Sequence, residues 1–274
     1  MKIGEVLSLT TQYLHKHGVD SPRLSAEWLL ADLLAVKRLD LYLRFDQSLP
    51  EELLETLRTL VRRRARGEPL QYIQGYALFR GQRFTVTPAT FIPRPETEIL
   101  LEEILPFLDP QGPPILDVGT GCGVLAICLA QMFPQLTIFG CDKSDAALAV
   151  AKENAQGLGN VTFLESDLLD GAPQIFYQAI VANLPYIPTA WIPKLPKEIQ
   201  WEPVLALDGG PDGMRYIRGL AEQARGRCRW LALEIGDGQA EPIQTSLQKL
   251  GYHVTKLVED LRGIPRVLIA QSCA

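Results

Sequence analysis

The amino-acid sequence predicts an α/β domain with a mostly parallel sheet, preceded by a small all-α helical bundle and a β-hairpin linker. Three observations support this prediction. Apolar residues recur at helical spacing over the first 67 residues. Apolar and polar residues then alternate up to about residue 92, and short apolar runs alternate with helical segments in the remainder. We therefore expect three parts, at residues 1–70, 71–93 and 94–274.

The first part of the chain is expected to fold as four short helices. The first helix ends at Gly18, and Pro22 lies in the opening turn of the second, where its missing backbone donor is not needed. A short segment around residues 39–45 follows, and Pro50 precedes the last helix. Because these helices carry no cluster of catalytic side chains, we expect a recognition or docking domain.

A dense basic run, RRRARG, closes this last helix at Arg62–Gly67. Cations near the C-terminal end of a helix interact favourably with the helix dipole, which favours a solvated helix end. Binding of a partner is the alternative for the same run.

The segment YALFRGQRFTVTP alternates around Arg80 and Gly81, a pattern typical of a β-hairpin. A helix from Glu96 then leads into PILDVGTGCG, an apolar strand with a glycine turn at its end. Further strands and helices alternate in the order expected for a parallel sheet. They are LTIFGCD, AALAVAKENAQGLG, VTFLESD, QAIVAN, WLALEIG, EPIQTSLQKLGY and two final strands near 254–258 and 266–270.

The composition is that of a folded globular protein, with 274 residues, 47% hydrophobic and 22% charged. Apolar runs stay well below the roughly 20 residues that cross a bilayer. The N-terminus mixes charges into a helical period, unlike a secretory signal. The five cysteines form no CxxC pair and lie mostly in apolar contexts, as in a reducing compartment. We therefore expect a cytoplasmic protein that does not contact membranes.

The charge pattern argues against a protein that binds nucleic acid chiefly through phosphate contacts. The formal net charge is -5, whereas such proteins gather an excess of Lys and Arg on one face. The three histidines, His15, His17 and His253, are scattered without Cys or Asp partners at ligand spacing. We therefore expect no metal site.

The glycine turn LDVGTGCG places Gly119, Gly121 and Gly123 in a G-x-G-x-G pattern after a strand. Glycines let the backbone turn sharply and approach a ligand closely. A dinucleotide site expects its third glycine one residue later, and a P-loop expects Gly-Lys-Ser/Thr, which is absent. At the next two strand ends, Asp142 suits the ribose hydroxyls of a nucleoside and Asp167 suits the exocyclic amine of adenine.

Each of these features is weak singly, since glycine turns are common and acids at strand ends often cap helices. Together, at three successive strand ends, they resemble the class I S-adenosylmethionine methyltransferases. The resemblance implies that S-adenosylmethionine is bound and that S-adenosylhomocysteine is the product. The expected cofactor contacts are Gly119, Thr120, Gly121, Cys122, Gly123, Asp142, Asp167, Leu168 and Asn183.

The fourth strand ends in Asn183-Leu184-Pro185-Tyr186, in the place of the Asn/Asp-Pro-Pro-Tyr motif of methyltransferases that act on planar nitrogens. An amide or arylamine nitrogen attacks a methyl group poorly because its lone pair is delocalised. The side-chain oxygen of Asn183 and the carbonyl of residue 184 can hold its two N–H groups and favour the attacking form. Tyr186 would stack on the planar group, and the prolines would fix both acceptors in advance. A plain strand stop followed by a turn is the alternative.

The segments FIPRPETE at 91–98, EPVLALDGGPDG at 202–213 and DLRGIPRVLIA at 260–270 resemble signatures of the release factor glutamine methyltransferases, the PrmC or HemK family. With the helical domain and the hairpin, the resemblance covers essentially the whole chain. It implies methyl transfer to N5 of the glutamine in the Gly-Gly-Gln motif of bacterial peptide-chain release factors, which the helical domain contacts. Asn183 and Tyr186 are the expected catalytic residues. The expected substrate-side residues are Phe91, Arg94, Glu96, Asn183, Leu184, Pro185 and Tyr186.

The sequence departs from that family at two positions. Leu184 replaces the first proline of the usual motif, a form also found in rRNA adenine dimethyltransferases, and keeps the backbone acceptor with less rigidity. Leu168 stands where many relatives have an aromatic residue, and it can pack on adenine without stacking. The leading alternative is an adenine-N6 methyltransferase acting on RNA or DNA, and a non-catalytic binding module is the second. Asp208-Gly209-Gly210 is expected to form a turn without chemistry.

Overall fold

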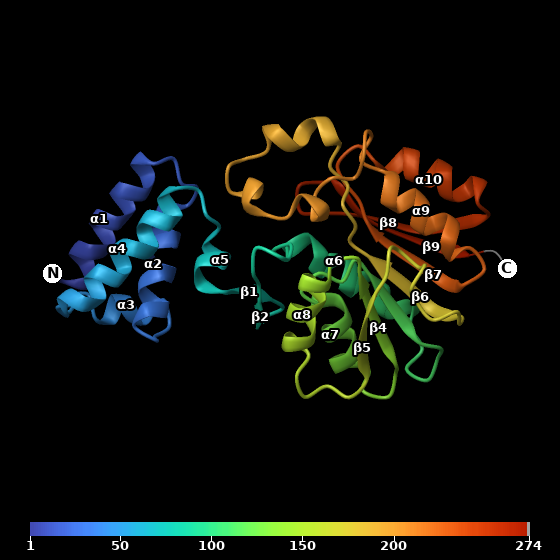
Figure 1. The fold of residues 1–274 in the computed structure, drawn as a ribbon, viewed down its shortest axis with the longest axis horizontal. Helices are drawn as coiled ribbons and strands as arrows, with labels where there is room; N and C mark the ends of the chain where they lie inside the picture. Colours follow the sequence, from blue (N-terminus) through green and yellow to red (C-terminus); the bar gives the residue numbers. More distant parts are fainter. Residues whose placement is uncertain (273–274) are drawn as a thin grey trace. The chain divides into compact units, whose positions relative to one another are not determined.

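The computed structural model describes residues 1–272 and contains two compact units (Figure 1). The helical unit comprises Met1–Tyr76 together with Pro196–Trp201. The sheet unit comprises Ala77–Leu195 and the chain from Glu202 onward. A short segment from the second half of the sequence therefore belongs to the unit formed by the N-terminus.

The helical unit is built from α1 (Ile3–Lys16), α2 (Pro22–Leu33), α3 (Asp40–Leu43), α4 (Glu51–Ala65) and α5 (Leu70–Gln74). Its core consists of apolar side chains that recur at helical spacing, among them Ile3, Leu7, Leu14, Leu29, Leu30, Leu41, Leu54 and Leu57. Fully burying one such side chain is worth roughly 1.5–3 kcal/mol, so short helices can be held by packing. Helix α5 lies where the alternating pattern predicts extended structure. Gly75, with φ of 79°, ends it in the left-handed conformation.

The basic run at the end of α4 is not a uniformly solvated face. Arg62 is exposed, and Arg63 donates from Nε to Glu68 at 2.9 Å. Arg64 is only 4% exposed, and its guanidinium donates to Glu198 at 2.8 Å. The run therefore splits into two exposed cations, Arg62 and Arg66, and two paired ones, and Arg64 belongs to the interior of the helical unit.

A hairpin of β1 (Tyr76–Phe79) and β2 (Gln82–Thr85) follows, as the alternating pattern predicts. Its two turn residues, Arg80 and Gly81, have φ of 48° and 75°. Two successive positive φ values are those of a type I′ turn, whose twist matches that of the flanking strands.

The sheet unit contains seven strands in the order β5-β4-β3-β6-β7-β9-β8. Strand β9 runs antiparallel to both β7 and β8, and the other neighbouring pairs are parallel. The strands are β3 (Ile115–Val118), β4 (Ile138–Asp142), β5 (Val161–Glu165), β6 (Tyr177–Ala182), β7 (Cys228–Glu234), β8 (Tyr252–Glu259) and β9 (Pro265–Ser272). The predicted mostly parallel sheet is therefore confirmed.

Helices cover both faces of the central strands, since every residue of β3 and β6 is buried. The α-helices are α6 (Pro95–Ile104), α7 (Val124–Met132), α8 (Asp145–Asn154), α9 (Arg215–Ala224) and α10 (Ala240–Lys249). The 3-10 helices of this unit are η1 (Leu105–Phe107), η2 (Thr189–Lys194) and η4 (Val204–Ala206), and η3 (Ile199–Trp201) belongs to the helical unit. Helix α9 is absent from the sequence-based prediction, although its buried Ile217, Leu220, Ala221 and Ala224 recur at helical spacing.

The strand order creates one reversal of direction across the sheet. The chain moves from β3 outward through β4 to β5, then returns to β6 on the other side of β3. Val118 of β3 is level with Cys141 of β4 and Ala182 of β6, so the loops that follow these strands begin at one edge. In open α/β sheets, ligands bind in the crevice beyond the carboxyl ends of the strands at such a reversal.

Two expectations from composition can be compared with the structure. Within residues 1–272, no helix is long and apolar enough to span a bilayer. Cys122, Cys128, Cys141 and Cys228 are buried and form no disulfide, which confirms that they act as small apolar side chains. Cys273 lies outside the described residues.

Candidate active site

The glycine turn after β3 is tied to the neighbouring strand. The N–H of Gly119 donates to the carbonyl of Cys141 at 2.8 Å. Gly119, Gly121 and Gly123 have φ of 73°, 57° and 89°, a region in which other residues are strained. A side chain at Gly119 would also meet Cδ2 of Leu184 at 2.9 Å. The turn and the Asn183-Leu184-Pro185-Tyr186 motif are therefore in direct contact.

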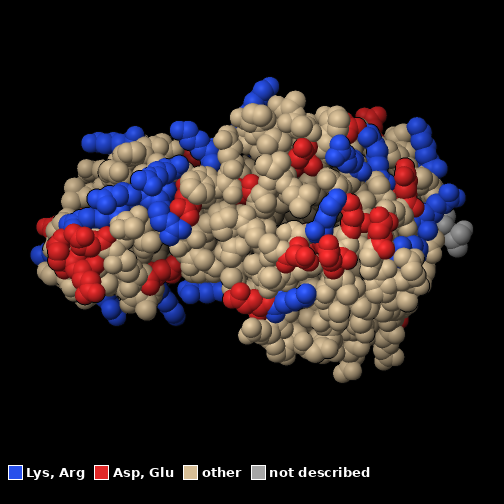
Figure 2. All heavy atoms as spheres, viewed as in Figure 1, with Lys and Arg blue, Asp and Glu red and all other residues tan. Residues whose placement is uncertain are grey.

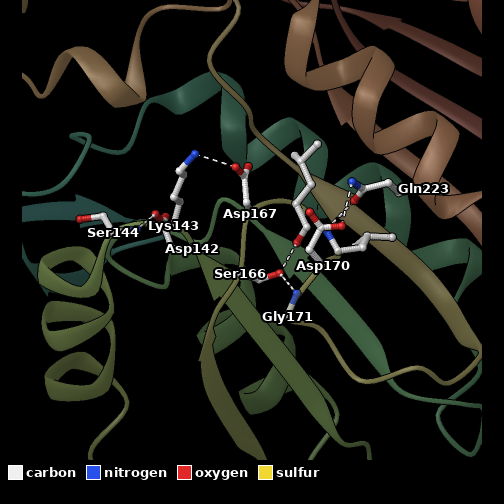
Figure 3. Close-up of polar contacts among 10 residues, drawn as sticks. Asp142, Lys143, Ser144, Ser166, Asp167, Asp170, Gly171 and Gln223 are labelled. Atoms are coloured by element: carbon white, nitrogen blue, oxygen red, sulfur yellow. Dashed lines mark hydrogen bonds and ion pairs between the residues drawn. The ribbon is translucent and has the colours of Figure 1, made fainter.

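Asp142 lies at the carboxyl end of β4, beside the glycine turn (Figure 3). Its Oδ2 accepts a hydrogen bond from the N–H of Gly121 at 2.9 Å, and its Oδ1 accepts one from the N–H of Ser144 at 2.9 Å. Each carboxylate oxygen has a further lone pair for a ribose hydroxyl. Burial raises the pKa of Asp142, and hydroxyl donors would favour its charged form.

Asp167 follows β5 and forms an ion pair with Lys143, 2.6 Å from carboxylate oxygen to Nζ (Figure 3). Both side chains are about half exposed. Exposed ion pairs contribute little to stability because solvent screens them, so a ligand amine can displace Lys143 at little cost.

Leu168 is held in an unusual backbone conformation next to Asp167. Its φ is 53°, which costs a residue with a side chain roughly 1–2 kcal/mol. Its carbonyl accepts a hydrogen bond from the hydroxyl of Ser166 at 2.8 Å, and that hydroxyl also accepts from the N–H of Gly171 (Figure 3). The side chain of Leu168 lies against Gly219 of α9. The strained loop is therefore fixed from two sides.

Asp117, near the carboxyl end of strand β3, is a buried carboxylate that sequence reasoning missed. Its Oδ2 accepts from the hydroxyl of Thr120 at 2.6 Å and from the N–H of Ala126 at 3.2 Å, while its Oδ1 has no hydrogen-bond partner. Burial raises the pKa of Asp117 to about 7. A buried acceptor without a donor is costly, so a cationic or N–H group of a bound cofactor would fit here.

Asn183 directly follows β6 and is half-buried. Its Nδ2 donates to Oγ1 of Thr97 at 2.9 Å, and that hydroxyl donates to Oε2 of Glu234 at 2.7 Å. Within residues 1–272, no donor is bonded to the side-chain oxygen of Asn183. The amide oxygen is therefore free to accept a hydrogen bond from a ligand.

Tyr186 is fixed through its hydroxyl, its ring and its backbone. The hydroxyl lies 3.5 Å from Oε1 of Glu234, and the ring contacts Gly236, where an added Cβ would be 3.0 Å from Cδ2. The carbonyl of Tyr186 accepts from Nε2 of Gln239 at 2.9 Å. Burial raises the pKa of the Tyr186 hydroxyl, which keeps the group neutral.

The expected turn at Asp208-Gly209-Gly210 packs against this motif. Ile187 and Asp208 form a parallel bridge. A Cβ at Gly209 would lie 2.7 Å from the carbonyl of Pro185, and one at Gly213 would lie 2.2 Å from the carbonyl of Tyr186. Only glycine permits these approaches, so the segment at 202–213 braces the motif from behind.

Leu184 presents only its backbone to a ligand. Its side chain is 5% exposed and belongs to the main core of the sheet unit. The Leu184 side chain, which stands where the family usually has proline, therefore fills space in the core. The carbonyl of residue 184 remains the second candidate acceptor.

The three residues expected on the substrate side from the segment at 91–98 pack mainly against other parts of the sheet unit. Arg94 forms an ion pair with the buried Glu202, and its guanidinium lies 4.8 Å from the ring centre of Phe91. Glu96 lies 3.8 Å from Arg262. These pairs join the segments at 91–98, 202–213 and 260–270, so the sequence signatures form one interlocked structure.

Sequence reasoning missed Asp117, Thr97, Glu234 and Gln239. A signal existed for three of them. Asp117 directly precedes the glycine turn, Thr97 is part of the quoted FIPRPETE segment, and Glu234 is a charge at the end of the apolar run WLALEIG. Gln239 carries no local signal, since its role depends on two distant carbonyl groups.

The fold and this arrangement define a class I S-adenosylmethionine-dependent methyltransferase. Residues 5–75 match the family model of the PrmC N-terminal domain, and residues 110–185 match that of a methyltransferase domain. A release factor glutamine methyltransferase from Geobacter sulfurreducens is 40% identical over 97% of this chain and 95% of its own length. One from Moorella thermoacetica is 40% identical over 98% of each chain. The chain belongs to the release factor glutamine methyltransferase family.

Solved structures of lower identity share the fold. The hMettl16 catalytic domain in complex with MAT2A 3'UTR hairpin 6 aligns with a TM-score of 0.58 and 16% identity, over 70% of this chain and 76% of that one. A methyltransferase from Pyrococcus furiosus aligns with a TM-score of 0.53 and 18% identity, over 72% and 91%. The predicted fold class is confirmed by these similarities.

Proposed function

We propose that this protein transfers a methyl group from S-adenosylmethionine to the N5 amide nitrogen of the glutamine in the Gly-Gly-Gln motif of bacterial peptide-chain release factors. The observation that carries the proposal is the Asn183 amide, which donates to Thr97 and keeps its oxygen free beside the glycine turn. Relatives that match nearly the whole chain are named for this activity.

S-adenosylmethionine supplies an electrophilic methyl group on its sulfonium. The turn from Gly119 to Gly123, with Thr120 and Cys122, lets the backbone approach the cofactor closely. Asp142 would accept hydrogen bonds from the ribose hydroxyls, and Asp167 and Leu168 would hold the adenine. The unpaired oxygen of Asp117 suits a cationic group of the cofactor, because a cation removes the cost of burying that carboxylate.

The methyl acceptor is held by two oxygens. Oδ1 of Asn183 and the carbonyl of Leu184 each accept one N–H of the substrate amide, which turns the nitrogen lone pair toward the methyl group. Positive charge grows on that nitrogen during transfer, so both hydrogen bonds strengthen in the transition state. Tyr186 stacks on the planar amide, and Pro185 stiffens the loop that carries both acceptors.

The helical unit supplies the binding surface for the release factor. Helix α3 and its flanks expose large apolar side chains, namely Leu39, Tyr42, Leu43 and Phe45, with Leu43 85% exposed. Such patches on a folded protein commonly mark contacts with partners. A substrate that works in translation also places the proposed activity in the cytoplasm.

An adenine-N6 methyltransferase acting on RNA or DNA is the alternative. On the face seen in Figure 2, the described Lys and Arg residues of the sheet unit are interspersed with Asp and Glu, without a broad basic stripe. The net charge of -5 points the same way. We therefore expect no strong binding of nucleic acid.

The test compares four acceptors at saturating S-adenosylmethionine. A purified release factor, the same factor with the motif glutamine replaced by asparagine, and RNA and DNA oligonucleotides are incubated with the protein, and methylation is located by mass spectrometry. We expect one methyl group on the glutamine of the intact factor. Methylation of adenine alone would contradict the proposal, and so would methylation of the factor at another residue.

A further inference from the structure

A buried hydrogen-bonded chain extends from Asn183 to two residues that have no part in the reaction as proposed. The distances are 2.9 Å from Asn183 Nδ2 to Thr97 Oγ1 and 2.7 Å from Thr97 Oγ1 to Glu234 Oε2. Thr97 is 2% exposed and Glu234 is 1% exposed. Thr97 and Glu234 are therefore hydrogen-bonded to each other rather than to bulk water. The chain links the first turn of α6 to the ends of β6 and β7.

The Glu234 carboxylate determines which groups donate and which accept along this series of hydrogen bonds. An ionised carboxylate has only acceptors, so the hydroxyl of Thr97 must donate its single proton to it. That hydroxyl can then only accept a hydrogen bond from Asn183. The two ends of an amide are alike in shape, so hydrogen bonding decides which end faces which way. With Glu234 ionised, the NH2 group of Asn183 faces Thr97 and the oxygen faces away.

We propose that Thr97 and Glu234 are positioning residues that hold the Asn183 amide with its oxygen toward the methyl acceptor. The site then selects a nitrogen that still carries N–H groups, and it rejects a hydrogen-bond acceptor at that place. This inference rests on the proposed function, since it concerns how the same amide is aimed. It also gives the threonine of the FIPRPETE segment a chemical role.

Protonation of Glu234 would remove this control. A neutral Glu234 carboxyl can donate a hydrogen bond to the hydroxyl of Thr97. The Thr97 hydroxyl can then donate its own proton to the oxygen of an Asn183 amide that has turned around. Burial raises the pKa of Glu234 to about 7, Glu96 also raises it, and Thr97, Arg266 and Tyr186 lower it. Of these, Arg266 is itself paired with Asp260 at 3.0 Å. Loss of the proton as the pH rises through neutrality therefore favours the productive orientation.

The first experiment separates the hydroxyl from the volume of Thr97. Thr97→Val keeps the volume and loses the hydroxyl, whereas Thr97→Ser keeps the hydroxyl. Single-turnover methylation of a release factor at saturating cofactor should fall about 10- to 100-fold in Thr97→Val, the scale for a misaligned reacting group. Thr97→Ser should stay within about threefold of the unmodified protein. Calorimetry should give the same S-adenosylmethionine affinity for all three, which also shows that each variant is folded.

The second experiment uses pH. Glu234→Gln can donate to Thr97 at every pH, so its rate should lack the rise near neutrality. The rate ratio of the unmodified protein to Glu234→Gln should be close to one at pH 5.5 and reach about tenfold or more at pH 8. Because this variant is nearly isosteric, the test stands even if Thr97→Val fails to fold. A ratio that does not change with pH would overturn the inference.

Thr255→Val is the control, since it removes an exposed hydroxyl hydrogen bond of 3.3 Å to the carbonyl of His253 on β8, away from the site. Its rate should stay within about twofold. Unchanged turnover in Thr97→Val, or an equal loss in Thr97→Ser and Thr97→Val, would overturn the inference while leaving the proposed function intact. Lack of release factor methylation by the unmodified protein would instead refute the proposed function.

Discussion

Glu27 in the helical unit and the two carboxylates beside the candidate site in the sheet unit are buried in opposite ways. In the helical unit, the buried Glu27 accepts hydrogen bonds from Arg23 and from the hydroxyl of Tyr42. In the sheet unit, Asp117 and Glu234 are at least as buried, yet their hydrogen bonds within residues 1–272 come from hydroxyl groups and one backbone N–H. Glu27 is thus paired with a cation, as is the buried Glu202 of the sheet unit with Arg94, whereas Asp117 and Glu234 beside the candidate site are held by neutral donors.

This difference changes the ionisation of the carboxyl groups. For Glu27, burial raises the pKa, but hydrogen bonds from Tyr42 and Arg23 and the nearby charges outweigh it, so the pKa is lowered overall. For Asp117 and Glu234, burial dominates and raises each pKa to about 7. Buried carboxyl groups whose pKa is raised by burial are typical of functional sites, whereas paired ones are typical of structural cores.

The largest expected effect concerns Asn183. Asn183→Ala removes one oriented acceptor, so kcat for the release factor should fall about 10²- to 10³-fold, with little change in cofactor affinity. Asn160→Ala is the matched control in the same unit, since its amide bonds only backbone carbonyl groups. It should lower stability and spare turnover. Near-normal single-turnover rates in a folded Asn183→Ala protein would refute the mechanism.

The second prediction compares Glu234→Gln with Glu27→Gln. Glu234 has a raised folded pKa, so its favourable contribution is present below the unfolded pKa of about 4.3 and is lost as the pH rises through about 7. Glu234→Gln should therefore increase the free energy of unfolding at pH 8 by up to about 3 kcal/mol, and this gain should vanish below about pH 4.5.

Glu27→Gln should act in the other direction. It breaks a buried pair and should decrease the free energy of unfolding at pH 8 by about 1–3 kcal/mol. Because the folded pKa of Glu27 is lowered, this loss should shrink as the pH falls below about 4.3. Urea unfolding at pH 4.5 and 8 measures both variants. Changes of the same sign at pH 8 would contradict the contrast between Glu27 and Glu234.

The third prediction concerns the cofactor alone. Asp142→Ala should weaken S-adenosylmethionine binding by about 1–3 kcal/mol, the scale for losing hydrogen bonds to a charged group. Asp145→Ala, three positions further on the exposed first turn of α8, should leave the affinity unchanged. Calorimetry measures both, and equal affinities in the two variants would remove Asp142 from the cofactor site.

The smallest expected effect lies on the helical unit. Leu43→Ser should lower kcat/KM for intact release factor about tenfold, the lower range for a contact residue of an interface, and leave turnover of a short Gly-Gly-Gln peptide unchanged. Leu261→Ser, at a fully exposed leucine of the sheet unit, is the matched control. Equal losses at both positions would remove the distinction between a docking surface and an ordinary surface leucine.

The sequence predicted the parts of the site that depend on local pattern. The glycine turn, Asp142 and Asn183 each follow an apolar strand, and the carboxyl ends of parallel strands meet at one edge, so their proximity could be inferred. The contact between Gly119 and Leu184 bears this out. The spacing of the apolar residues and the order of the strands therefore predict which residues meet at the candidate cofactor site.

The support behind the site could not be predicted in the same way. Thr97 and Glu234 are 137 residues apart, and no local period relates them. The braces at Gly209 and Gly213 depend on backbone approaches so close that an added Cβ would lie less than 3 Å from a carbonyl oxygen, and only the folded chain defines them. Helix α5 is five residues long, too short for a 3.6-residue period to be distinguished from alternation.

Pro196–Trp201 has a consequence for how the protein is made. Arg64 and Glu198 are 134 residues apart in a chain synthesised from its N-terminus. At about 5–20 residues per second, roughly 7–30 s separate the synthesis of these two partners. Throughout that interval the nascent helical unit holds Arg64 without its carboxylate, while β3 to β6 emerge from the ribosome. The unit that is translated first is therefore completed only after most of the sheet has been synthesised.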